Sequence, residues 1–185
     1  MSDFFTLKFE DDFLVYIDQP KLPLEEEYIT TDNYERIAEA IERLEIRGAP
    51  AIGIAAAYGV TVGMKGVTEN YKSRFNSVYE RLKITRPTAV NLFWALDEMK
   101  KVFASEPDYN TVYIKLKIRA IEIHNDDIIS CDMIAKNGAE LFENDSVILT
   151  HCNTGQLATG GAGTAFAVIK KAYELGFFII EYPLI

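Results

Sequence analysis

Apolar and polar residues alternate along the first part of the chain. Residues 4–18, FFTLKFEDDFLVYID, follow this alternation except at the acidic triplet Glu10-Asp11-Asp12. A period of two is typical of a half-buried strand, and a polar interruption between two such runs indicates a turn. The pattern therefore predicts a β-hairpin with an acidic turn, which the segment Gln19-Pro20-Lys21-Leu22-Pro23 ends.

Helical spacing of apolar residues replaces the alternation after residue 31. A cap cluster, Thr31-Asp32-Asn33, precedes one such pattern, and Pro50 and Pro87 mark two other starts, because proline is well tolerated in the first turn of a helix. Gly53 and Gly59 are expected to let the helix near Pro50 pack closely against another element. The expected helices are residues 34–46, a helix from residue 50, residues 70–82, a helix from residue 87, and residues 109–142 with a kink near His124.

The pattern changes again at residue 144. A β-branched run, VILTH, is followed by a glycine-rich loop, a helix that ends near Gly176 and a second apolar run, FFIIEYPLI. This order is typical of a βαβ unit, which normally belongs to a parallel sheet covered by helices. We therefore predict an α+β N-terminal domain at residues 1–143, with a β-hairpin or small antiparallel sheet, helices and a connecting helix. Residues 144–185 are predicted to be the first βαβ unit of an incomplete Rossmann-like α/β domain.

Charge and cysteine content narrow the possible partners and the cellular compartment. The 185 residues include 28 acidic and 19 basic side chains, a net charge of -9. Because an acidic chain repels phosphate backbones, we expect no nucleic acid partner, and any anionic ligand must be held by a few placed cations. Two cysteines are too few for a disulfide scaffold and fit a reducing cytoplasm. The absence of a signal-like start and of a membrane-length apolar run predicts a cytoplasmic protein without membrane contact.

Two arginines each precede a predicted helix start, in the segments Arg47-Gly48-Ala49-Pro50 and Arg86-Pro87-Thr88. Free N–H groups at a helix N-terminus favour an anion, and a guanidinium adds charge-assisted hydrogen bonds. The pair predicts a phosphate or carboxylate that is held from two sides. The alternative is that both arginines are solvated and merely precede helices.

Cys152 directly follows the predicted strand VILTH. Ligands of open α/β sheets bind at the carboxyl ends of strands, so this position suits a reactive thiol. The alternative is a buried cysteine that acts as a small hydrophobic residue. A dyad with the adjacent His151 is not expected, because successive residues of an extended chain point to opposite faces.

The glycine-rich loop at residues 159–165, TGGAGTA, precedes the last predicted helix. Its Gly161, Gly163 and Thr164 are candidates for a phosphate-binding loop. Phe166 occupies the third glycine position of a dinucleotide fingerprint and no Lys-Ser or Lys-Thr pair follows the glycines, so neither an NAD site nor a Walker loop is predicted. We predict no metal site, because His124 with residues 126–127 is too sparse and is better interpreted as a solvated helix face.

Three long segments together carry a family resemblance: RGAPAIGIAAAYG from Arg47, RPTAVNLFWAL from Arg86 and THCNTGQLATGGAGTA from Thr150. They resemble the methylthioribose-1-phosphate isomerases of the methionine salvage pathway. That family is related to the regulatory subunits of translation initiation factor 2B and to ribose-1,5-bisphosphate isomerases. The resemblance implies an aldose–ketose isomerase that converts 5-methylthioribose 1-phosphate to 5-methylthioribulose 1-phosphate without a cofactor. It also implies substrate binding by Arg47, Gly48, Ala49 and Arg86, and catalysis by Cys152.

The resemblance also marks what this chain lacks. Members of the family are much longer, and their downstream catalytic Asp, substrate-binding Gln and Asn-Lys pair have no counterpart here. We therefore expect a truncated member, with an inactive form as the alternative to an active one. A non-catalytic regulatory or assembly module, like the initiation factor 2B subunits, is a further alternative. Because an apolar final strand would leave an open sheet edge, we expect a homodimer or a higher homo-oligomer.

Overall fold

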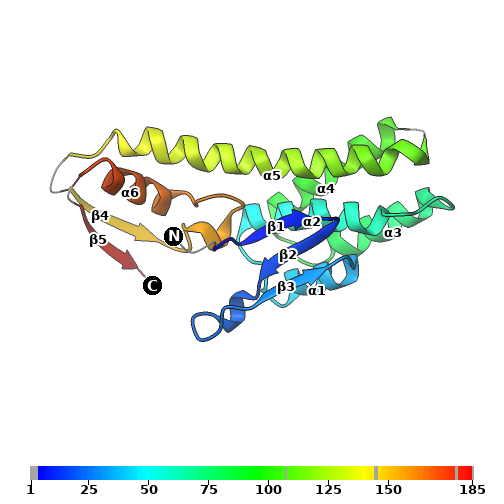
Figure 1. Cartoon of the computed structure of the whole chain (residues 1–185), viewed down its shortest axis with the longest axis horizontal. Coiled ribbons are helices and arrows are strands. Elements are labelled where there is room, and N and C mark those ends of the chain that lie inside the picture. The colour runs from blue at the N-terminus through cyan, green and yellow to red at the C-terminus, as the bar shows by residue number, and fades with distance from the viewer. Residues whose placement is uncertain (1–3, 107, 144–145, 178, 185) are drawn as a thin grey trace.

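A small antiparallel sheet opens the computed structural model, which describes residues 4–106, 108–143, 146–177 and 179–184 (Figure 1). Its strands lie in the order β1 (Leu7–Glu10), β2 (Phe13–Ile17) and β3 (Tyr28–Thr31). Asp11 and Asp12 form the turn between β1 and β2, with φ of 50° and 66°. Two such residues suit a tight hairpin, because their twist matches that of the strands. The predicted hairpin is confirmed, and β3 extends it to a three-stranded sheet.

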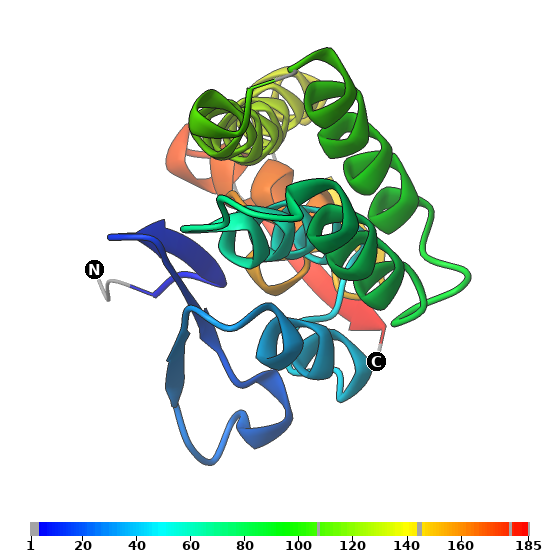
Figure 2. The same cartoon turned by 90° about the vertical axis from the view of Figure 1, so that its right-hand side faces the viewer.

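Helix α2 (Ala49–Met64) lies at the centre of the core and is buried on nearly every side. Around it pack α1 (Tyr34–Glu42), α3 (Tyr71–Lys83), α4 (Val90–Ser105) and α5 (Tyr109–Ala139), with the small sheet to one side (Figure 2). A Cβ at Gly53 would lie 2.8 Å from the Asn91 carbonyl oxygen, and one at Gly59 would lie 3.0 Å from Leu82 Cδ1. The interpretation of both glycines as packing residues is confirmed.

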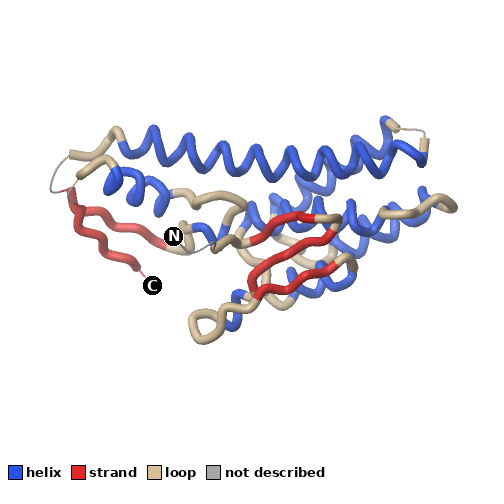
Figure 3. Tube along the Cα trace, in the orientation of Figure 1, coloured by secondary structure: helices blue, strands red, loops and turns tan. Residues whose placement is uncertain are grey.

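Helices α1, α4 and α5 differ from the prediction. Helix α1 ends at Glu42 rather than residue 46, because Leu44 adopts a φ of 63° that a helix cannot contain. Helix α4 begins at Val90 rather than Pro87, because residues 86–89 form a turn in which the Ala89 N–H donates to the Arg86 carbonyl at 3.0 Å. Helix α5 is continuous over 31 residues, so the expected kink near His124 is wrong (Figure 3).

The last part of the chain forms a parallel βαβ unit from β4 (Ser146–His151), α6 (Ala165–Glu174) and β5 (Ile179–Leu184). Helix α6 packs against α5 so closely that a Cβ at Gly138 would lie 2.7 Å from Val168 Cγ2. The Rossmann-like continuation of this unit stays a prediction. The domain boundary also stays a prediction, and residues 144–145 lie outside the described residues.

The described strands β4 and β5 pair only with each other. Association of copies through the open edges of this sheet stays a prediction. Among the residues that the structure describes, no helix combines the length and the apolar character that crossing a bilayer requires.

Candidate functional site

A cavity of about 520 Å³ lies between the start of α2 and the loop that follows β4. The loop comprises residues 152–164 and includes the short 3-10 helix Gln156–Ala158. The residues that line the cavity come from these two distant segments of the chain: Arg47, Gly48, Ala49, Pro50, Cys152, Asn153, Ala158, Thr159 and Thr164. The structure therefore brings together the predicted phosphate-binding segment that begins at Arg47 and the predicted catalytic Cys152.

Gly48 makes this close approach of the two segments possible. Its φ is 104°, and a Cβ there would lie 2.5 Å from Ala158 Cα and 2.7 Å from the Ala158 carbonyl oxygen. Only glycine, which has no Cβ, can adopt this backbone conformation and fit so close to Ala158. Gly48 also offers no side-chain cap to α2, so the first-turn N–H groups of Ala49 and Ala51 have no capping side chain and can face an anion, whereas Pro50 has no N–H.

Cys152 lies immediately beyond the carboxyl end of β4, where the sequence places it. Its side chain is exposed and lines the cavity, which excludes the alternative of a buried structural cysteine. Its φ of 70° is uncommon for a residue with a side chain, and such conformations concentrate at functional sites. The thiol is thus accessible to a ligand that occupies the cavity.

Arg47 is held by Gln19, a residue that no sequence pattern indicates. Its Nε donates to Gln19 Oε1 at 3.2 Å, and Gln19 Nε2 donates to the Leu157 carbonyl at 2.8 Å. Gln19 is buried, with 3% of its surface exposed. In the sequence Gln19 is an isolated amide at the end of the hairpin, and no motif there indicates its role.

Helix α5 holds the loop from the other side through His124 and Asp127. The His124 Nε2 lies 3.2 Å from the Gly160 carbonyl oxygen, its Nδ1 lies 2.9 Å from the Tyr58 hydroxyl, and Asp127 accepts from the Gly160 N–H at 2.7 Å. Burial lowers the pKa of His124, which keeps the imidazole neutral near pH 7. One tautomer satisfies every group: Nε2–H donates to Gly160, and the Tyr58 hydroxyl donates to Nδ1.

The interpretation of this part of α5 as a solvated face is therefore wrong for His124 and Asp127, although Asp126 is exposed. Both residues lie on the face of α5 that carries the buried Ala120 and Ile123. Helical spacing from these apolar neighbours is the sequence signal that could have placed His124 inside.

The N-terminal segment adds two more hydrogen bonds to the loop. Thr6 Oγ1 donates to the Gln156 carbonyl at 2.7 Å, and Gln156 Nε2 donates to the Phe4 carbonyl at 2.7 Å. With Gln19 and α5, these contacts hold the middle of the loop, at residues 156–160, in place. The cavity wall that carries Cys152 is therefore preorganised before any ligand arrives.

Three other predicted site residues lie outside the lining of the cavity. A Cβ at Gly161 would lie 3.0 Å from Ile128 Cα, so this glycine packs on α5. Gly163 pairs with Gly155 in an isolated β-bridge and closes the loop on itself. Arg86 is part of the turn before α4, and its Nη1 is buried without a hydrogen-bond partner. Phosphate binding by these three residues stays a prediction, whereas Thr164 does line the cavity.

The two cysteines differ enough for a direct chemical test. Cys131 is 1% exposed, and burial raises the pKa of its thiol, while Cys152 is exposed. We expect iodoacetamide to alkylate Cys152 at least about tenfold faster than Cys131, as followed by mass spectrometry of peptides. In urea, where both thiols are exposed, the two rates should converge. Faster labelling of Cys131 in the folded chain would contradict the geometry of the site.

No group of three His, Cys, Asp or Glu side chains within the described ranges is placed to hold a metal ion. The described residues that line the cavity supply a guanidinium, an amide, hydroxyls, a thiol and helix N–H groups.

Comparison with known proteins places these residues in a family. The model of the Initiation factor 2 subunit family matches residues 45–180. Methylthioribose-1-phosphate isomerase of Geotalea daltonii is 44% identical over 179 residues, 94% of this chain and 52% of that protein. The isomerase of the same name from Dehalococcoides mccartyi is 43% identical over 174 residues, 92% of this chain and 52% of that protein. This chain thus spans about half the length of the curated relatives it matches.

Two solved structures share the fold. Translation initiation factor eIF-2B, subunit delta, from A. fulgidus has a TM-score of 0.87 and 33% identity, over 98% of this chain and 54% of that one. The 5-methylthioribose 1-phosphate isomerase of Pyrococcus horikoshii OT3 has a TM-score of 0.87 and 31% identity, over 96% of this chain and 59% of that one. The family match includes both segments that line the cavity. The chain therefore belongs to the initiation factor 2 subunit family.

Proposed function

We propose that the cavity binds a phosphorylated pentose and that this chain carries the substrate-binding part of a methylthioribose-1-phosphate isomerase. The observation that carries this proposal is the meeting of Arg47, the N-terminus of α2 and Cys152 in one cavity. A guanidinium beside free helix N–H groups suits a phosphate, and a thiol near the bound sugar suits proton transfer. Curated relatives that are 44% and 43% identical to this chain are named methylthioribose-1-phosphate isomerase.

The proposed reaction sets a requirement on the site. Conversion of an aldose to a ketose moves hydrogen between neighbouring carbons and needs a second group to handle the proton on oxygen. Cys152 can serve the first task. Apart from Arg47, the other described lining residues are Asn153, Thr159, Thr164 and apolar or glycine residues, which do not titrate near pH 7. We therefore expect sugar-phosphate binding from the 185-residue chain, and turnover only where a further acid–base group is supplied.

Binding is tested by calorimetric titration of the chain with 5-methylthioribose 1-phosphate. Arg47→Ala should weaken binding about tenfold or more, because a charge-assisted hydrogen bond to phosphate is lost. The matched control is Arg43→Ala, since Arg43 is exposed and its ion pair with Glu39 lies away from the cavity lining. Unphosphorylated 5-methylthioribose should not compete. Equal affinities of the Arg47 and Arg43 variants would contradict the proposal.

The same titration decides the role of Arg86. If the Arg86 guanidinium, whose Nη1 is buried, reaches the phosphate when a ligand is bound, Arg86→Ala should weaken binding as Arg47→Ala does. If it only fixes the turn before α4, the variant should bind like the wild type. Two results would favour the alternative of a non-catalytic module. Either both arginine variants bind as tightly as the wild type, or the wild type itself does not bind. The structural likeness to the eIF-2B delta subunit supports that alternative.

A further inference from the structure

Gln19 contacts Arg47, which lines the cavity, and Leu157, which belongs to the loop that follows β4. It follows β2 at the start of a short 3-10 helix, and its side-chain amide is buried. Its oxygen accepts from Arg47 Nε, and its nitrogen donates to the Leu157 carbonyl. The Gln19 side chain therefore connects Arg47, which we propose binds the phosphate, with the loop that carries Cys152.

The chemistry of the partners fixes the orientation of this amide. A guanidinium only donates and a backbone carbonyl only accepts, so the Gln19 oxygen must face Arg47 and its nitrogen must face Leu157. Because Nε of Arg47 is engaged by Gln19, its two terminal nitrogens remain for a ligand; they make no hydrogen bond to another described residue. A guanidinium anchored in this way can present both terminal groups to one phosphate.

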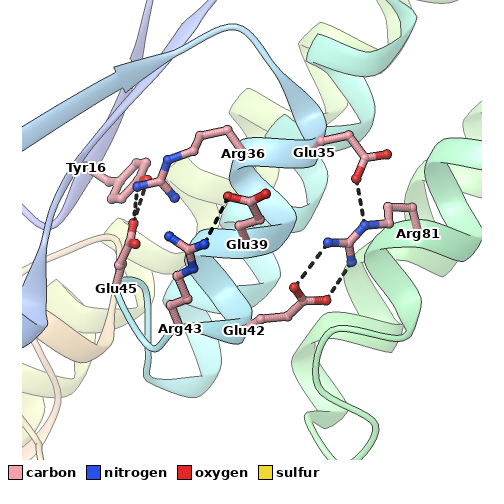
Figure 4. Close-up of polar contacts among 8 residues, drawn as sticks. All are labelled: Tyr16, Glu35, Arg36, Glu39, Glu42, Arg43, Glu45 and Arg81. Atoms are coloured by element: carbon pink, nitrogen blue, oxygen red, sulfur yellow. Dashed lines mark hydrogen bonds and ion pairs between the residues drawn. The ribbon is translucent and has the colours of Figure 1, made fainter.

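The backbone around Gln19 and Arg47 rests on a buried polar cluster. Tyr16 OH and Arg36 Nη2 both donate to Glu45 Oε2, at 2.9 Å and 2.5 Å (Figure 4). The Glu45 side chain is 8% exposed, and its backbone carbonyl accepts from the Gln19 N–H at 3.4 Å. Burial and the hydrogen bond to Glu45 raise the pKa of Tyr16 above its usual range, so the phenol stays a donor. The Gln19 backbone is thus hydrogen-bonded to Glu45, whose side chain is held in place and which lies two residues before Arg47.

We propose that Gln19 is a positioning residue that sets the direction of the Arg47 guanidinium relative to the loop at residues 155–160. The role of Gln19 in phosphate binding rests on the proposed function, because Gln19 acts on a ligand only through Arg47. A fixed Nε leaves one arrangement of the terminal N–H groups, which lowers the entropy that a phosphate must remove on binding. Gln19 itself need not touch the ligand.

A double-mutant cycle distinguishes positioning from a general structural role. Gln19→Met should weaken binding of 5-methylthioribose 1-phosphate about tenfold in the wild type, and should have no further effect in the Arg47→Ala background. A residue that only supports the fold would cause the same loss in both backgrounds. Equal losses would therefore overturn the proposal.

A second measurement needs no ligand. In ¹⁵N-labelled chain, the Arg47 Nε–H should exchange with solvent about tenfold faster in Gln19→Met, because its acceptor is gone. Gln19→Glu keeps an acceptor oxygen and should leave that exchange slow, although the contact with Leu157 is lost. Gln156→Met is the matched control, since Gln156 also binds the loop to a backbone carbonyl but does not contact Arg47.

The outcomes separate this inference from the proposed function. If the wild type binds no sugar phosphate but Arg47 exchange depends on Gln19 as described, the proposed function fails and the positioning of Arg47 stands. If Arg47 exchange is unchanged in a folded Gln19→Met chain, or is equally fast in Gln19→Glu, the positioning role is overturned. Amide spectra of each variant establish that the chain is folded.

Discussion

Replacing Gly48 by alanine is expected to lower the free energy of unfolding by about 3 kcal/mol and to abolish sugar-phosphate binding. The variant would force a side chain into a conformation with φ of 104° and place its Cβ 2.5 Å from Ala158 Cα. Backbone strain and overpacking each cost about 1–3 kcal/mol. The cheapest relief is to push the loop away from α2, which opens the cavity. Urea denaturation followed by circular dichroism measures the first effect, and calorimetry measures the second.

Gly66→Ala provides the matched control for Gly48→Ala. Gly66 also has a positive φ, 69°, but a Cβ there would meet no atom within 4 Å. This variant should lose only about 1 kcal/mol, from backbone strain alone, and should keep its affinity. If both alanine variants unfold at the same urea concentration and bind equally well, the contact between Gly48 and Ala158 does not shape the site.

Arg36→Met is expected to destabilise the chain by about 2 kcal/mol. The change removes the cation from the buried carboxylate of Glu45 and leaves the Tyr16 hydroxyl as its remaining side-chain partner. Breaking a fully buried pair costs about 3–5 kcal/mol, and the Arg36 side chain is 27% exposed, which reduces that figure. The free energy of unfolding from urea titration is the measurement.

Arg43→Met tests whether burial, and not the loss of any arginine, causes that effect. Arg43 follows α1 and pairs with Glu39, but the two side chains are 66% and 44% exposed (Figure 4). An exposed pair of this kind contributes about 0.5 kcal/mol or less. If Arg43→Met lowers the free energy of unfolding as much as Arg36→Met does, the buried position of the Glu45 cluster does not increase its contribution to stability.

Local patterns were sufficient to predict the elements whose form depends on nearby residues. The alternation around the acidic turn at residues 11–12 predicts the hairpin, and Pro50 predicts the start of α2. Pro87 suits both a helix start and a turn, so it does not fix the start of α4, and the hydrogen bond between Arg86 and Ala89 selects the turn. Local patterns do not predict the burial of His124, because that burial depends on a loop far along the chain.

The sequence predicts the candidate site only in part, because the site depends on contacts between distant segments of the chain. Arg47 and Cys152 each occupy a position that favours a ligand, but their meeting in one cavity depends on how α2 packs against the loop after β4. Gln19 has no signal of its own, since its function depends on partners 28 and 138 residues away. Such a residue is found from contacts and not from spacing.

The hydrogen bonds that hold the loop also constrain the order in which parts of the molecule can fold. The hydrogen bonds from Thr6 and Gln19 to the loop join residues 150 and 138 positions apart. Contacts of this separation form late, because the entropy of closing a long chain must be overcome first. As the chain leaves the ribosome, the sheet and the helices around α2 can pack while the loop is still unmade. The cavity that Arg47 and Cys152 line is therefore completed only after residue 164 has emerged.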